Sequence, residues 1–128
     1  MVKLSVLDQS TSSTGQSDAR SIQSTVKLAK VCEKLGYSRF WVSEHHNHPT
    51  ISGSAPEILM AAITQVTSSI RIGSAGIMLP HYAPIKIAEQ FRVLEALAPN
   101  RIDLGIGRAP GSDGKTAHAL NPNTIIDS

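Results

Sequence analysis

The chain has 128 residues, of which 41% are hydrophobic and 17% are charged, and its net charge is +2 at pH 7. A chain of this length and composition can form one globular domain with a buried core, which excludes an intrinsically disordered protein. The small net charge, the absence of a Lys/Arg cluster and the absence of an apolar run of about 18 residues indicate neither a nucleic-acid partner nor a membrane partner.

The first predicted elements are a strand, a long loop and a helix. The strand ends at Asp8, and a loop rich in Ser, Thr and Gly continues to Ser17, which is longer than most strand-to-helix connections. We expect Ser17 or Asp18 to cap the helix and Gly36 to end it. Cys32, the only cysteine, lies on the apolar stripe of this helix, so we expect a packed thiol. Since no internal disulfide can form, the chain suits a reducing compartment, and we expect a cytoplasmic location.

The middle of the chain predicts a second strand and a second helix. Phe40–Val42 combines aromatic and β-branched residues, which suits a buried strand, and leads directly into Glu44-His45-His46. A capping box at Ser54–Glu57 then predicts a helix with an apolar face. That face consists of Ile58, Leu59, Ala62, Ile63, Val66 and Ile70.

A third strand and a third helix follow. The strand at 71–79 contains Gly73-Ser74-Ala75-Gly76, and small residues inside a strand mark close approach of another backbone or of a ligand. On the residues alone, relief of crowding and room for a flat ring are equal explanations. Pro84 suits the first turn of the next helix.

The fold class follows from this alternation of strands and helices, which predicts a parallel sheet with right-handed crossovers. A fourth strand at 101–107 places Asp103 and two glycines on one face, which suits the interior of a barrel better than a sheet covered on both faces. We therefore predict an α/β fold, the N-terminal half of a (β/α)8 TIM barrel. Residues 1–110 supply four βα units and 111–128 a polar tail, within a single domain, 1–128.

Two polar clusters stand at predicted strand ends. The run Glu44-His45-His46-Asn47-His48 contains metal-ligand residue types, but adjacent residues of an extended chain point opposite ways and no second cluster completes a site, so no metal is predicted. The histidines are either residues of a polar loop or groups that bind an anion or transfer a proton near neutral pH. Gly105–Gly111 lacks the third glycine of a dinucleotide fingerprint. It leaves Arg108 as a solvated turn residue or as a cation for a planar or anionic ligand.

Three stretches together resemble the bacterial luciferase-like flavin monooxygenases, in particular the non-luminescent alkanal-monooxygenase-like branch. They are 40–46 (FWVSEHH), 71–80 (RIGSAGIMLP) and 100–111 (NRIDLGIGRAPG), and the turn and helix at 80–91 also fit. The resemblance implies a (β/α)8 barrel that binds reduced FMN supplied by a separate flavin reductase. It further implies reaction with O2 and oxygenation of an aldehyde or a similar small substrate.

The resemblance also implies roles for individual residues. His45 matches a histidine used beside the flavin, and Glu44 and Arg108 match a carboxylate and an arginine of the flavin site. Ala75-Gly76 matches a non-proline cis peptide behind the flavin ring. Gly107 stands where luciferase has a reactive cysteine, which argues against luciferase itself and leaves the substrate open. Asp8 is added as a cofactor-binding candidate from its place at a strand end alone.

Two rival functions remain at this stage. A half-barrel exposes two sheet edges and its interior face, which predicts a homo-oligomer and permits a non-catalytic, self-associating protein. The same barrel also hosts oxidoreductases that transfer hydride with F420 or FMN instead of using O2.

Overall fold

The computed structural model describes residues 1–123, in which strands and helices alternate as predicted. The strands are β1 (Ser5–Asp8), β2 (Arg39–Val42), β3 (Arg71–Ser74), β4 (Ile77–Met78), β5 (Ile102–Asp103) and β6 (Ile106–Gly107). The helices are α1 (Asp18–Lys34), α2 (Pro56–Thr64), α3 (Pro84–Leu97) and α4 (Gly114–Leu120), and a short 3-10 turn, η1, covers Leu79–His81. The end of the predicted polar tail, 124–128, lies outside the described residues.

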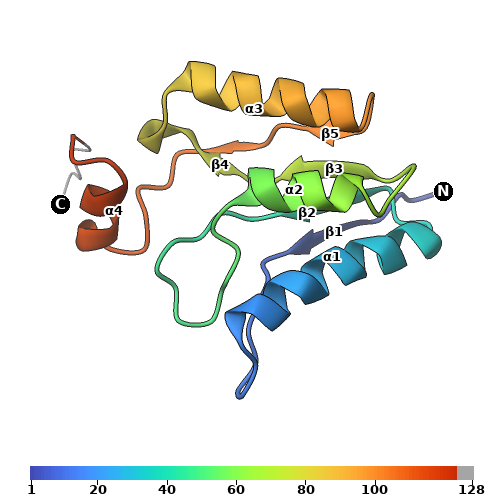
Figure 1. Ribbon diagram of the computed structural model, residues 1–128, viewed down its shortest axis with the longest axis horizontal. Helices are drawn as coiled ribbons and strands as arrows, with labels where there is room; N and C mark the ends of the chain where they lie inside the picture. The colour runs from blue at the N-terminus through green and yellow to red at the C-terminus, as the bar shows by residue number, and fades with distance from the viewer. Residues whose placement is uncertain (124–128) are drawn as a thin grey trace.

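The main sheet is parallel and four-stranded, in the order β1-β2-β3-β5, and β4 pairs with β6 in a second, two-stranded parallel sheet (Figure 1). In the main sheet Trp41 pairs with Gly73, and Gly73 pairs with Asp103. Within the main sheet, α1, α2 and α3 connect the neighbouring strands in turn, which is the βαβ arrangement that the sequence predicts.

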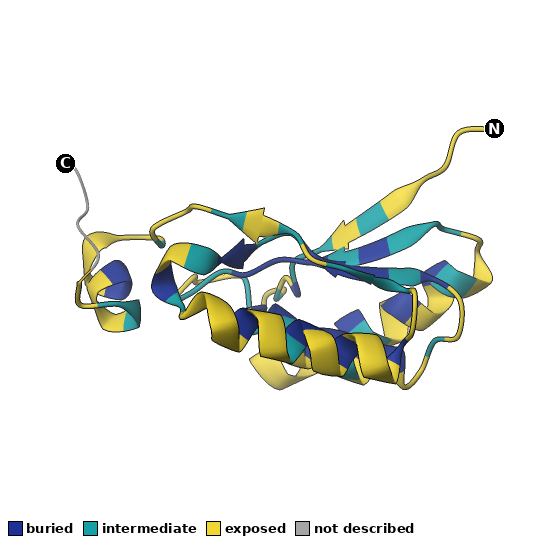
Figure 2. Ribbon diagram, turned by 90° about the horizontal axis from the view of Figure 1, so that it is seen from above, coloured by how far each residue is buried: buried dark blue, intermediate teal, exposed yellow. Residues whose placement is uncertain are grey.

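Helices α1, α2 and α3 all cover one face of the sheet, and no element within residues 1–123 covers the opposite face (Figure 2). The core lies between the sheet and these helices. It includes Phe40, Val42 and Ile72 from the strands, and Ala29, Cys32, Met60, Ile63, Phe91 and Leu94 from the helices. The expected burial of the Cys32 thiol is confirmed, and burial raises its pKa, with the charge of Asp8 adding to the effect.

Asp103 is the centre of a polar network on the uncovered face. Its carboxylate accepts hydrogen bonds from Arg71 Nη2 (2.6 Å), Trp41 Nε1 (3.1 Å) and Arg39 Nε (3.2 Å). Burial alone would raise the pKa of Asp103, but the bonds from Arg71 and Trp41 and the neighbouring positive charges lower it. The Trp41 indole lies over Gly73, where an added Cβ would stand 2.5 Å from the indole nitrogen. The face predicted for Asp103 is therefore confirmed.

Local sequence explains most helix ends. Ser17 caps α1, with its hydroxyl oxygen accepting a backbone N–H at 3.3 Å, and Gly36 follows the helix at a φ of +82°, which suits glycine. Pro56 lies in the first turn of α2, as predicted. The predicted capping box is wrong, because the N-cap is Ala55, one residue after Ser54, and no side chain caps this helix.

Helix α4 forms inside the region predicted as a polar tail. Asp113 caps it by accepting the Thr116 N–H at 2.9 Å, and the turn before it uses Gly111 at a φ of +129°. Its Ala117 is fully buried, so this short helix packs on the rest of the domain. Among residues 1–123, no helix combines the length and apolarity that a membrane crossing requires.

Candidate functional site

The sheet changes at its carboxyl end, where the segments 71–79 and 101–107 were each predicted as one strand. Each is split in two, into β3 and β4 and into β5 and β6. At the split, Ser74 Oγ donates to the Gly105 carbonyl (2.9 Å) and accepts from the Gly105 N–H (3.0 Å). The peptide bond between Ala75 and Gly76 is cis, as the family resemblance implies. The pair β4–β6 thus forms a small separate ladder at the sheet edge.

Gly76 and Gly105 let the two backbones touch at this split. An added Cβ on Gly105 would collide with the Ser74 carbonyl oxygen, and one on Gly76 would lie 2.9 Å from the Ile106 carbonyl carbon. The space beside Gly76 is therefore filled by the neighbouring strand. Between the two explanations that the sequence left equal, the structure favours close contact of backbones at this glycine.

Glu44, two residues after the end of β2, is a buried carboxylate with three partners. Its side chain is 1% exposed, and Oε2 accepts the Tyr82 hydroxyl at 2.9 Å and lies 2.9 Å from His46 Nε2. Tyr82 and His46 are themselves 3.4 Å apart, and the Met78 N–H faces Oε1 at 3.4 Å. Because a buried carboxylate is costly without such partners, this cluster fixes the end of β2 against the turn before α3.

The phenol of Tyr82 is held in its neutral form. Burial raises its pKa well above the ordinary value, and the hydrogen bond to Glu44 and the charge of Glu44 raise it further. Tyr82 therefore remains a hydrogen-bond donor to the carboxylate over the physiological pH range.

His45 points away from this cluster. Its backbone N–H donates to the Gly53 carbonyl at 2.9 Å, and its half-buried ring lies 6.1 Å from the ring of His48, measured between centroids. His45 lines a hollow of about 440 Å³ together with Asp18 of α1 and with Asn47 and other residues of the loop after β2. Glu44 and His45 thus both lie at the carboxyl end of the sheet, but their side chains face different parts of the molecule.

Asp8, at the end of β1, faces the helix layer. Its Oδ2 accepts the Thr25 hydroxyl of α1 at 2.5 Å and the Ser10 N–H at 3.0 Å. These bonds commit the carboxylate to fastening the loop after β1 onto α1. The placement gives no support to Asp8 as a cofactor ligand.

Arg108 follows β6 and is exposed. It lines a hollow of about 460 Å³ whose other walls are apolar, among them Leu79, Pro80, Tyr82 and Ile106. Since Met78 pairs with Gly107, Arg108 stands one residue from the strand pair that carries the Met78 N–H to Glu44. The structure therefore brings Glu44, Gly76 and Arg108 to one edge.

Sequence reasoning missed two residues of this site. Tyr82 reaches Glu44 from a turn 38 residues later, and no local pattern announces that contact. The signal for His46 was present, because residues two apart on an extended chain point the same way. A further missed feature is the contact of the segment before α4 with the loop after β2, in which Ser112 Oγ donates to the His46 carbonyl at 3.1 Å.

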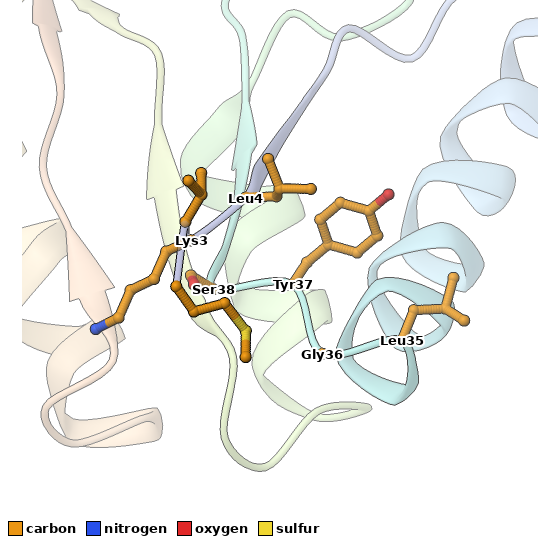
Figure 3. A pocket seen from close by; sticks show the side chains of 8 residues that line it. Lys3, Leu4, Leu35, Gly36, Tyr37 and Ser38 are labelled. Carbon is orange, nitrogen blue, oxygen red and sulfur yellow. The ribbon is translucent and has the colours of Figure 1, made fainter.

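Another hollow, of about 530 Å³, lies at the opposite end of the sheet, near the amino ends of the strands (Figure 3). Residues that precede β1 and β2 line it, among them Leu4, Leu35 and Tyr37. Ligands of parallel α/β sheets collect at the carboxyl ends of strands, so this hollow is not a candidate for the chemistry.

The residues around Arg108 fit the flavin that the resemblance implies. An apolar hollow beside one guanidinium suits a flat ring with polar or anionic edges. At Gly107 the backbone is open, because an added Cβ would approach no other atom closer than 3.8 Å. No group of three or more His, Cys, Asp or Glu side chains in the described part of the chain is placed to hold a metal ion.

A parallel sheet covered by helices on one face only, with polar side chains at the carboxyl ends of its strands, is the arrangement expected of part of a (β/α)8 barrel. The sequence matches the luciferase-like monooxygenase family over residues 2–125, and the chain belongs to this family.

Two similar relatives come from Bacillus subtilis strain 168. The uncharacterised protein YwcH is 55% identical over 121 residues, and an N-acetyl-S-alkylcysteine monooxygenase is 52% identical over 120 residues. Each match covers 94% of this chain and 36% of the relative. The chain thus spans about a third of the length of these relatives.

Solved structures confirm the predicted fold class. The crystal structure of apo-MsnO8 is 47% identical and covers 100% of this chain and 39% of its own, with a TM-score of 0.94. The oxygenating constituent of 3,6-diketocamphane monooxygenase from Pseudomonas putida, in complex with FMN, is 23% identical, with a TM-score of 0.84 over 94% of this chain and 33% of its own. An F420-dependent secondary alcohol dehydrogenase is 19% identical, with a TM-score of 0.61 over 82% of this chain and 31% of its own.

Proposed function

We propose that this chain is the flavin-binding N-terminal part of a monooxygenase that uses reduced FMN and O2 to oxygenate a small organic substrate. The observation that carries the proposal is the placement of Arg108 beside an apolar hollow at the carboxyl end of the sheet, next to the strand pair whose Met78 N–H faces Glu44. Membership in a family of monooxygenases and the FMN complex of a neighbour with the same fold support it. The reductant reaches the site from a separate flavin reductase.

Each site residue has a part that its surroundings suit. Bound reduced flavin would supply two electrons to O2, so that one oxygen atom enters the substrate and the other leaves as water. Arg108 offers a cation at the apolar hollow. His45, half-buried, lines the separate hollow after β2, where an imidazole can transfer a proton near neutral pH. Glu44, fixed by Tyr82 and His46, holds the Met78 backbone in place.

The substrate is an aldehyde-like or another small organic molecule. One relative is named for N-acetyl-S-alkylcysteine, so a thioether belongs among the first substrates to try. A gain of one oxygen atom in the product mass identifies the oxygenated compound in either case.

The first experiment is an anaerobic titration of dithionite-reduced FMN into the chain, followed by fluorescence. It is repeated with a polypeptide that supplies the rest of a relative's length. Saturable binding in at least one of the two is expected, and its absence in both contradicts the proposal. In the active assembly, His45→Ala should reduce turnover with little change in melting temperature, because the bond of His45 to Gly53 comes from its backbone N–H, which alanine keeps.

A hydride-transfer oxidoreductase is the second candidate, because a neighbour with the same fold is F420-dependent. Incorporation of one oxygen atom from O2 into the substrate separates the two, since hydride transfer inserts no oxygen. A non-catalytic, self-associating half-barrel is the third candidate, because the sheet has an uncovered face. A tight dimer without flavin binding or oxygen uptake would favour it.

A further inference from the structure

His81, in the turn η1, is almost fully buried, and within residues 1–123 its side chain makes a single hydrogen bond. The residue is 7% exposed, and its Nε2 lies 2.7 Å from the Pro110 carbonyl oxygen. Because a carbonyl only accepts, Nε2 carries the hydrogen and donates it. Within residues 1–123 its other ring nitrogen, Nδ1, has no partner, which is unusual for a buried polar atom. The bond to Pro110 therefore joins the buried ring to the segment that follows β6.

That bond and the β4–β6 pair hold Arg108 from both sides. On one side Gly107 pairs with Met78, and on the other side the Pro110 carbonyl is held by His81. Met78, the last residue of β4, lies three residues before His81, the last residue of η1. A further bond, from the Asn121 side chain to the Pro80 carbonyl at 3.1 Å, fastens the end of α4 to this turn.

The turn and the held segment are the two sides of the hollow at Arg108. Leu79, Pro80 and Tyr82 line it from the turn, and Gly107 and Arg108 line it from the strand end. Figure 1 shows that α4 and the turn before α3 lie at the same end of the molecule. The His81–Pro110 bond thus joins the two sides of the hollow beyond the end of the β4–β6 pair.

We propose that His81 is a positioning residue, whose hydrogen bond to Pro110 places the Arg108 guanidinium over the hollow for a planar or anionic ligand. The ligand part of this inference rests on the proposed flavin site. The positioning part rests on the geometry of His81 alone.

The positioning is tested with trypsin, which cleaves after exposed Arg residues, under native conditions. His81→Leu removes the donor, and cleavage after Arg108 should become at least about tenfold faster, because local opening controls native proteolysis. His81→Gln, whose side-chain amide can still donate, should restore most of the protection. Cleavage after Arg92, exposed on α3, is the internal reference for global unfolding.

Equal cleavage after Arg108 in the wild type and in His81→Leu would overturn the positioning role. An equal acceleration after Arg92 would also overturn it, because His81 would then stabilise the whole domain instead of one segment.

The ligand part is tested with a double-mutant cycle on the affinity for FMN. His81→Leu and Arg108→Ala should each weaken binding by about tenfold, and the double variant should bind no more weakly than Arg108→Ala alone. Additive losses would show that His81 does not act through Arg108. If the wild type binds no FMN, either alone or with the polypeptide that supplies the rest of a relative's length, the proposed function fails, while the trypsin experiment still decides the role of His81.

Discussion

Glu33, in the last turn of α1, fastens that helix to the turn before β3. Its carboxylate accepts the backbone N–H groups of Ser68 (2.9 Å), Ser69 (2.8 Å) and Ile70 (2.9 Å). Burial alone would raise its pKa, but the hydrogen bonds from Ile70, Ser69 and Ser68 outweigh burial and lower the pKa to about 2. A residue without a part in the candidate site thus carries a pH dependence of the fold.

Glu33→Gln should lower the free energy of unfolding by about 1 kcal/mol at pH 7, since the bonds are charge-assisted but partly exposed to water. Because the folded-state pKa is lowered, the wild-type advantage is complete above about pH 4.5 and is lost as the pH falls toward about 2. Urea unfolding at pH 7 and at pH 3 checks both statements. Glu89→Gln, on the exposed surface of α3, is the matched control, and an equal loss in both variants would contradict the role of Glu33.

The positions of single residues were predictable where they follow directly from the ends of predicted strands. Glu44, Arg108 and the pair Ala75-Gly76 lie at the predicted carboxyl end of the sheet, because parallel strands all end on that side. Contacts between distant segments were not predictable, as Tyr82 on Glu44 shows. Asp8 was placed at the right strand end, but its side chain faces the helices, since alternation along a short strand decides the face.

At the level of elements, close backbone contact decides where the strands break. Ser74 bonds to both backbone groups of Gly105, and no side chain fits between the two segments. A hydrophobic pattern cannot reveal this contact, which is why the sequence predicted two continuous strands. The glycines were the only sequence signal of this close contact. Some glycine positions, such as Gly107, have room for a Cβ, whereas others, such as Gly105, do not.

Gly105→Ala should destabilise the domain by more than about 2 kcal/mol, because its Cβ would collide with a backbone carbonyl that cannot move without breaking the sheet. Gly107→Ala, two residues later, should change stability by less than about 1 kcal/mol, since its Cβ would meet only ordinary contacts at 3.8 and 3.9 Å. Urea unfolding of the two variants gives the comparison. Similar losses for both would contradict the close contact at Gly105.

The helices were predicted in the right order but with partly wrong faces. In α2 the structure buries Leu59, Met60 and Ile63, whereas Ile58 is 68% exposed. The helix ends at Thr64, so Val66 falls outside it and does not extend the predicted stripe. An apolar residue every three or four positions defines more than one stripe in an apolar helix, and only packing on the sheet selects one.

For the whole molecule, the main feature is a sheet with one covered and one uncovered face. Leu7 on that uncovered face is 55% exposed, and its neighbour Trp41 is only partly covered. Exposed apolar side chains on a face with free sheet edges promote association. The predicted homo-oligomer is therefore a property that the isolated chain can be tested for.

The 128-residue chain should self-associate, and Leu7→Lys should weaken the association at least about tenfold, because burying a leucine contributes about 1.5–3 kcal/mol. Sedimentation velocity over a range of concentrations measures the effect. Leu28→Lys, at an exposed position of α1, is the matched control and should change little. A monomer at every concentration, or equal dissociation constants for both variants, would contradict this role of the uncovered face.

The sheet is divided into two ladders, so residues of the small ladder can change while the strand pairing of the four-stranded sheet stays the same. Residues 77–78 and 106–107 form their own pair and meet the four-stranded base through the Ser74 hydroxyl. Substitutions above this junction alter the groups presented to a ligand without disturbing the registers below it. The chemistry of such a protein can therefore change through a few substitutions at the carboxyl end of the sheet, while the four-stranded sheet below it keeps its structure.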